Sequence, residues 1–172
     1  MYVCHMNYEE GKEKIIQAWG ILGGSWGINK TMAQIHALLM ISPEALSTEE
    51  IMDELNISRG NANMNIRALI DWGIVYKEFK PGERKEFFKS EKDVWVLATQ
   101  VAKERRRREL APILKVLKEV QSVDGSKDDK LDEFKKMTKD LKNFAEKSDN
   151  LLDKFERSES NWFFNTLMKF IK

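Results

Sequence analysis

Arginine and asparagine side chains recur over a short stretch, residues 59–67, with the sequence RGNANMNIR. Each can form two hydrogen bonds with one base edge, arginine with guanine and asparagine with adenine. Ala62, Ile66 and Leu69 recur at helical spacing, so we expect a helix with these residues facing inward. The outward residues and their neighbours are Arg59, Gly60, Asn61, Asn63, Met64 and Arg67. The chemistry that this pattern favours is recognition of base edges in duplex DNA.

Two small residues stand where this helix would begin. Ser58 is a good N-cap, because its hydroxyl can accept a hydrogen bond from the first turn. Gly60 in the first turn costs about 1 kcal/mol of helix stability relative to alanine. A close approach of the helix N-terminus to a phosphate would explain the glycine. The alternative is a chance glycine on a solvated face.

The elements that must position this helix begin at Ser47. Ser47-Thr48-Glu49-Glu50 predicts a capping box at the start of a short helix. Asn56 follows, and asparagine tolerates the left-handed backbone of a tight turn. The second helix is expected from Arg59 to about Trp72, closed by Gly73. Two capped helices joined by a tight turn therefore precede the next element.

The hydrophobic period changes after Gly73 and predicts a two-stranded hairpin. Residues 74–80 and 84–90 are rich in β-branched and aromatic side chains, and Pro81-Gly82 between them suits a type II turn. Helix, turn, helix and hairpin in this order are typical of a winged helix-turn-helix, whose second helix enters the major groove. Arg84 and Lys85 stand where a wing would contact phosphate. An ordinary charged hairpin is the alternative.

Five segments of the chain resemble the GbsR-type branch of the MarR family of transcription regulators. They are SWG at 25–27, MISPEALS at 40–47, ISRGNANMNIRAL at 57–69, WGIV at 72–75 and PGERK at 81–85. The resemblance covers about residues 20–96, and the C-terminal half is similar only in being helical. It implies a homodimer, a pseudo-palindromic double-stranded operator, and repression relieved by a small-molecule effector. The residues that it would assign to DNA contact are Ser58, Arg59, Gly60, Asn61, Asn63, Met64, Arg67, Arg84 and Lys85.

Some relatives of this type are associated with choline and glycine betaine control, but no residue here ties the chain to that effector. Tyr8, Trp19, Trp26, Trp72 and Trp95 could line an aromatic cage for a quaternary ammonium ion by cation–π attraction. Aromatic residues at helical spacing more often belong to a core.

The expected fold is mainly α-helical with a small β-hairpin, in three parts. Residues 1–28 form an N-terminal arm, 29–92 the winged helix-turn-helix, and 93–172 a C-terminal helical region. The arm should be helical from about Tyr8 to Leu22, ended by Gly23-Gly24, and a second helix should span residues 30–41. We expect Pro112 to kink or divide the helix that covers residues 93–121.

A heptad seam runs along the long helix that follows residue 126. Its members, alternating steps of three and four, are Leu131, Phe134, Thr138, Leu141, Ala145, Ser148, Leu152 and Phe155. The tail, residues 159–172, is predicted to be a short amphipathic helix. A monomer would expose this apolar strip, so we interpret the first helix and the C-terminal helices as a dimer interface. The alternative is intrachain packing in a three-helix bundle.

A run of four arginines, 105–108, admits three interpretations: a solvated helix face, supplementary phosphate contact or a targeting signal. Flanking glutamates and the divergent directions of consecutive helical residues favour the solvated face. Cys4, His5 and His36 have neither the number nor the spacing of a structural zinc site.

The composition excludes several classes of protein. The 172 residues carry a formal net charge of +1, a single cysteine, and 42% hydrophobic residues. These values suit a cytoplasmic globular protein without disulfides, and no apolar run is long enough to cross a membrane. No constellation typical of an enzyme is present, and no cofactor is expected. The second hypothesis is a winged-helix module that binds protein in a larger assembly without specific DNA binding.

Overall fold

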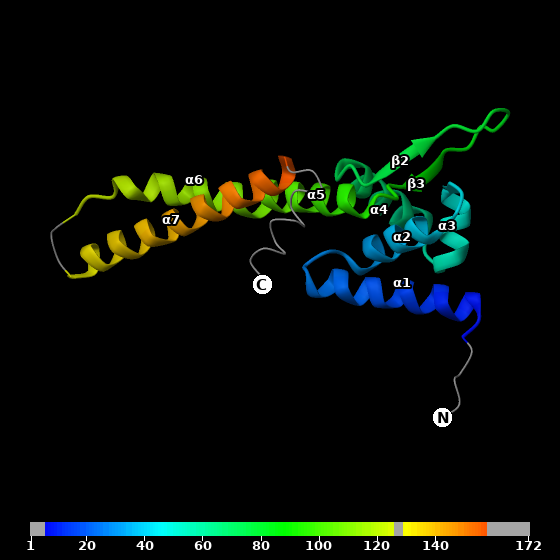
Figure 1. Cartoon of the computed structure of the whole chain (residues 1–172), viewed down its shortest axis with the longest axis horizontal. Helices are drawn as coiled ribbons and strands as arrows, with labels where there is room; N and C mark the ends of the chain where they lie inside the picture. The colour runs from blue at the N-terminus through cyan, green and yellow to red at the C-terminus, as the bar shows by residue number, and fades with distance from the viewer. Residues whose placement is uncertain (1–5, 126–128, 158–172) are drawn as a thin grey trace, which may run out of the picture. The chain divides into compact units, whose positions relative to one another are not determined.

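The structure is a computed structural model that describes residues 6–125 and 129–157. It divides into two compact units, Met1–Leu97 and Ala98–Lys172, and the chain passes from one to the other within a helix. Cys4, His5 and the predicted amphipathic tail at 159–172 lie outside the described residues. Both units are mainly helical, and the first also holds a small antiparallel sheet (Figure 1).

The first unit begins with two packed helices, α1 (Tyr8–Ser25) and α2 (Lys30–Ile41). The predicted end of α1 at Gly23-Gly24 is wrong, because the helix continues to Ser25 and turns out through Gly27, whose φ is +73°. Gly23 serves packing instead. A Cβ built there would lie 2.5 Å from the Cβ of Ala33, so the two helices approach more closely than any side chain would allow.

The helix-turn-helix consists of α3 (Thr48–Leu55) and α4 (Arg59–Asp71). The capping box of α3 is formed as predicted: the Glu50 amide donates to the Ser47 hydroxyl, and the Ser47 amide donates to the Glu50 carboxylate. Asn56 takes the left-handed conformation at φ +49° and ends α3. Ser58 then caps α4 by accepting a bond from the Asn61 amide. Each of these sequence predictions is confirmed.

The wing is formed by β2 (Val75–Glu78) and β3 (Phe87–Ser90), which pair antiparallel with Val75 opposite Ser90. Both strands are shorter than predicted, so a long loop separates them. A third strand, β1 (Leu46–Ser47), adds to β3 and gives the order β1-β3-β2. The expectation of two strands is therefore corrected, because the residues just before α3 pair with the wing.

The core of the first unit lies around α2, which is covered by α1, α4 and the sheet. The largest side chains that are fully buried come from α2, α3, α4 and β2: Ile35, Leu38, Leu39, Ile51, Ile66, Leu69 and Val75. The apolar residues of α4 that face this core, Ala62, Ile66 and Leu69, are those that the sequence placed inward. The outer face of α4 is consequently held in a fixed orientation by the packing beneath it.

Lys92 connects the segment after the wing to the end of α2. Its ammonium donates to the main-chain carbonyls of Leu39, Met40 and Ser42 at 2.7–2.9 Å. Helix C-termini leave their last carbonyls without partners, and a cation there also opposes the helix dipole. The lysine therefore caps α2 and ties the base of the wing to the core helix.

The second unit contains the end of α5 (Val94–Arg105), a wider π-helical turn at Arg106–Leu110, α6 (Ala111–Glu119), a 3₁₀ turn at Val120–Ser122, and α7 (Asp129–Arg157). The division predicted at Pro112 is confirmed. Proline has no N–H for the carbonyl four residues earlier. The wider turn before it bonds the Ala111 amide to the carbonyl of Arg106, five residues back.

Helices α6 and α7 lie side by side (Figure 1), and a small apolar cluster joins them. Leu114, Leu117 and Ala145 are buried in this cluster, with Leu110 packed against it. The intrachain alternative for the heptad seam therefore holds in part. Other apolar side chains on or beside the seam stay exposed, namely Phe134, Met137, Leu141, Phe144 and Leu151.

Candidate nucleic-acid interface

Helix α4 presents most of the predicted contact residues on one accessible surface. Ser58, Arg59, Gly60, Met64 and Arg67 are exposed, whereas Asn61 and Asn63 are half-buried. Met64 is 59% exposed and lies on this outward face with them. No side chain lies within 4 Å of the point where a Cβ of Gly60 would be, so packing within the chain does not require this glycine.

Three cations of the predicted set make no ion pair with any described residue: Arg67 on α4, and Arg84 and Lys85 in the wing. All three are exposed. Cations without a carboxylate partner remain available for phosphates, which bind with strong dependence on salt. Their position on the second helix and the wing is the arrangement that a winged helix uses on duplex DNA.

Other cations in this region are already paired. Arg59 donates to Glu49 at 2.8 Å, and Lys77 pairs with Glu86 at 2.5 Å. The hydrogen bond from its own backbone amide, followed by the one from the Arg59 guanidinium, lowers the pKa of Glu49 below its ordinary value. Arg59 would have to exchange this carboxylate for a phosphate before it could contact DNA.

A hollow of about 420 Å³ lies between the start of α3, helix α4 and the wing. Arg59, Arg67 and Lys85 are among the residues that line it, together with Glu49 and Asn63. The structure thus brings α4 residues and one of the two predicted wing cations to the same concave surface. Arg84 is exposed in the wing and does not line this hollow.

The turn of the wing has the predicted type II form. Gly82 has φ +83°, and the Glu83 amide donates to the Lys80 carbonyl at 3.1 Å. The Lys80 ammonium lies 4.4 Å from the centre of the Phe87 ring and 3.7 Å from Glu44, so it anchors the wing to the sheet. Phe79, which the sequence analysis did not single out, is 81% exposed.

Asn65 was also missed by the sequence analysis, which treated only the outward arc of α4. It is 3% exposed, and its side-chain amide donates to both the main-chain carbonyl and the side-chain oxygen of Asn61, at 2.9 and 2.7 Å. The available signal was its position among inward-facing residues, four residues after Asn61. A buried polar side chain at such a position needs a partner.

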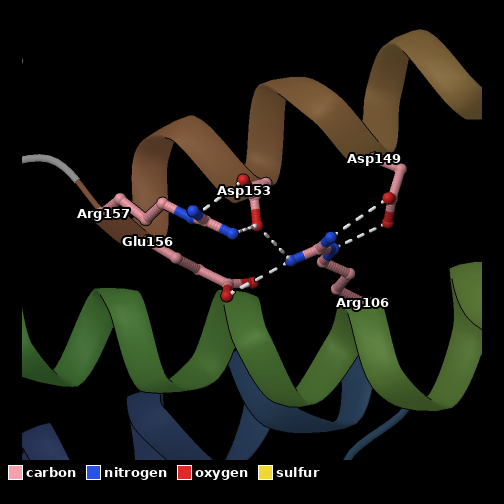
Figure 2. A network of polar contacts seen from close by, with 5 residues as sticks. All are labelled: Arg106, Asp149, Asp153, Glu156 and Arg157. Atoms are coloured by element: carbon pink, nitrogen blue, oxygen red, sulfur yellow. Dashed lines mark hydrogen bonds and ion pairs between the residues drawn. The ribbon is translucent and has the colours of Figure 1, made fainter.

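The arginine run at 105–108 is taken up by ion pairs within the second unit. Figure 2 shows Arg106 held between Asp149, Asp153 and Glu156 of α7, with Asp149 bound at 2.6 and 3.1 Å through two guanidinium nitrogens. The Arg106 guanidinium also holds the pKa of Asp149 below its usual range. This side chain joins the π-helical turn to α7 rather than lying on a solvated face.

The other three arginines of the run have carboxylate partners on their own helix. Arg107 and Arg108 both bind Glu104, whose pKa is lowered mainly by Arg107, and Arg105 binds Glu109 at 3.0 Å. The run therefore carries little free positive charge for a supplementary phosphate contact.

The five aromatic residues weighed as a cage do not gather in one place. Tyr8 and Trp26 lie at opposite ends of α1, a separation of about 27 Å at the rise of an α-helix. Trp72 is buried at the end of α4, and the ring of Trp19 faces His36 at 6.4 Å between ring centres. The core interpretation is therefore the better one for Trp72 and Trp19.

Neither a metal-binding cluster nor a membrane-spanning helix occurs in the part of the chain that the structure describes. No cluster of three or more histidine, cysteine, aspartate or glutamate side chains suited to a metal ion occurs among residues 6–125 and 129–157. Over the same residues, no helix has both the length and the apolar character that crossing a bilayer requires.

Comparisons with known proteins agree with this geometry. The model of the MarR family matches residues 26–86, the stretch from the end of α1 to the end of the wing loop. The HTH-type transcriptional repressor GbsR of Bacillus subtilis (strain 168) is 23% identical over 114 residues. That alignment covers 66% of this chain and 63% of the repressor, so less than two thirds of the relative's length is matched.

A solved structure described as a transcriptional regulator superposes with a TM-score of 0.66. It covers 86% of this chain and 97% of its own, at 17% identity, and so supports the fold. With the capped helix-turn-helix and the wing, the matched family model identifies residues 26–86 as a winged helix-turn-helix of the MarR type, and the chain is similar to the GbsR-type regulators of that family.

Proposed function

We propose that the protein is a sequence-specific DNA-binding transcription regulator, acting as a dimeric repressor on a pseudo-palindromic operator. In this proposal the exposed face of α4 enters the major groove, and the wing contacts the adjacent backbone. The observation that carries the proposal is the set of unpaired cations, Arg67, Arg84 and Lys85, on the helix and wing of one winged helix-turn-helix.

Dimerisation is the second part of the proposal. Tyr8 and Ile21 on α1 are each 67% exposed, and Phe144 on α7 is 71% exposed. Phe144 belongs to an exposed apolar row on α7 that includes Met137, Leu141 and Leu151, and soluble monomers rarely leave such contiguous patches exposed. We propose that these faces pair two copies of the chain, which would place two α4 helices about 34 Å apart, one turn of DNA.

Regulation is the third part. In the proposal, the dimer occupies its operator and represses, and a small-molecule effector relieves the repression. The similarity to the B. subtilis repressor supports this sign of regulation.

The test is selection from a random duplex library, followed by gel shift of the selected duplex at two salt concentrations. We expect one enriched two-fold symmetric motif, bound by two copies of the chain, with affinity that falls steeply as salt rises. Arg67→Ala should weaken binding to the selected duplex by about 1–3 kcal/mol. The matched control is Lys136→Ala, which removes one exposed cation from α7 and should leave affinity unchanged.

Two results would contradict the proposal. Enrichment of no motif, with weak binding that ignores sequence, would favour the winged helix as a protein-binding module. Equal affinities of the Arg67→Ala variant and the unsubstituted chain for the selected duplex would remove Arg67 from the interface.

A further inference from the structure

The buried asparagine of the recognition helix determines which way a neighbouring asparagine faces. Asn65 is one turn after Asn61 on α4, and its side chain points back toward the N-terminus, as helical side chains do. One hydrogen-bond acceptor for its amide nitrogen is the main-chain carbonyl of Asn61, at 2.9 Å. A carbonyl can only accept, so this bond identifies the atom of Asn65 that faces Asn61 as the NH₂ group.

The second bond of the same nitrogen then fixes Asn61. The Asn65 NH₂ group has one more hydrogen, and it is directed at the side-chain oxygen of Asn61 at 2.7 Å. If the amide of Asn61 were reversed, two NH₂ groups would face each other at this distance, with no acceptor between them. The oxygen of Asn61 is therefore turned toward the helix, and its own NH₂ group is directed away from Asn65.

Position makes this orientation relevant to recognition. Asn61 is the third residue of α4 after the Ser58 cap, in the turn whose side chains contact base edges in helix-turn-helix proteins. Adenine recognition by asparagine needs both amide atoms, the oxygen for the adenine amino group and the nitrogen for N7. Here the oxygen is turned toward the helix, where Asn65 occupies one of its two lone pairs, so the NH₂ group is the amide end directed toward a partner.

We propose that Asn65 is a positioning residue for DNA recognition, which holds Asn61 as a hydrogen-bond donor to a base-edge acceptor, with guanine preferred over adenine. This inference rests on the proposed DNA-binding function. Guanine presents two acceptors in the major groove, N7 and O6, without an adjacent donor. An asparagine with an engaged oxygen and a free NH₂ group matches that edge.

The test compares motifs selected from a random duplex library by the unsubstituted chain and by three variants. Asn61→Ala identifies the base position that depends on Asn61. Asn65→Leu keeps a similar volume and removes the bonds that orient Asn61, so the guanine preference there should fall about tenfold while other positions keep theirs. Asn61→Ala should then have little further effect in the Asn65→Leu background.

Asn61→Asp is the variant that leaves the buried residue intact. Its carboxylate can still accept from Asn65, but it presents an oxygen outward where the NH₂ group was. Preference at the same position should move from guanine to a base with an amino group, cytosine or adenine, although overall affinity falls because of the added negative charge.

The outcomes separate the two proposals. Selection of no motif by the unsubstituted chain would defeat the proposed function itself. A motif whose Asn61 position favours adenine, or one that Asn65→Leu leaves unchanged at that position, would overturn the role of Asn65 while DNA binding stands. If Asn65→Leu does not fold, the preference of Asn61→Asp decides alone, and retention of guanine would overturn the inference.

Discussion

Replacing Gly23 with alanine tests how closely α1 and α2 pack. The added Cβ would lie 2.5 Å from the Cβ of Ala33, whereas carbon atoms in contact are normally about 3.5–4.0 Å apart. Both atoms are attached directly to helix backbones, so neither can rotate away. The helices must separate by about 1 Å to relieve the overlap, and the neighbouring contacts of α1 with α2 loosen with them.

The expected magnitude is the difference of two effects. Overpacking of a tight contact costs about 1–3 kcal/mol, and this overlap is severe enough to lie in the upper part of that range. Alanine is a better helix former than glycine by up to about 1 kcal/mol, less near a helix end. We therefore expect Gly23→Ala to lower the free energy of unfolding by about 1–2 kcal/mol, measured by urea unfolding followed by circular dichroism.

Gly24 provides a matched control on the next residue of the same helix. No atom lies within 4 Å of the point where its Cβ would stand, so Gly24→Ala keeps the gain in helix propensity without the overlap. It should stabilise the protein by up to about 1 kcal/mol. Ala33→Gly removes the other partner, and in that background Gly23→Ala should cost at least about 1 kcal/mol less. Equal stabilisation by the two alanines would refute the close approach of α1 and α2.

Two further predictions concern charge. His36 is 7% exposed, its Nε2 has no hydrogen-bond partner among the described residues, and burial lowers its pKa to about 4. Since the unfolded chain takes up this proton near pH 6.5, stability should fall as pH drops from about 6.5 toward 4, with about 2 kcal/mol lost by pH 5. His36→Leu should remove that part of the pH dependence in urea unfolding, and an unaltered pH dependence would contradict the assignment. Glu49→Gln removes the carboxylate that holds Arg59 at 2.8 Å. Binding to the selected duplex should strengthen a few-fold, and the slope of log affinity against log salt should steepen by about 1; an unchanged slope would mean that Arg59 meets no phosphate.

Much of the helix-turn-helix follows from local physics alone. The Ser47 capping box, the left-handed Asn56 and the Pro81-Gly82 turn each depend on residues within three or four positions of one another. Their backbone preferences are set by these neighbouring residues, and the tertiary structure retains all three. For the same reason, the periodicity of α4 predicted correctly that Ala62, Ile66 and Leu69 face the core and that Arg59, Met64 and Arg67 are exposed.

Partners distant in sequence could not be foreseen in the same way. The Arg106 guanidinium finds its carboxylates 43 to 50 residues later on α7. Lys92 reaches carbonyls about 50 residues earlier. Long flexible cations are compatible with many partners, so the sequence could not show which carboxylates the arginines bind. It therefore favoured a solvated helix face for the run.

The sequence by itself determined the order of elements, the capped ends of α3 and α4, the turn of the wing and the residues that α4 presents outward. Tertiary structure decided what happens where two elements meet. It added β1 to the edge of the wing and turned Asn65 inward onto Asn61. It also placed Gly23 inside α1, at a point where Ala33 of α2 leaves no room for a side chain. Backbone preference is a property of neighbouring residues in the chain, whereas close packing and the pairing of buried polar groups depend on which distant segments share one volume.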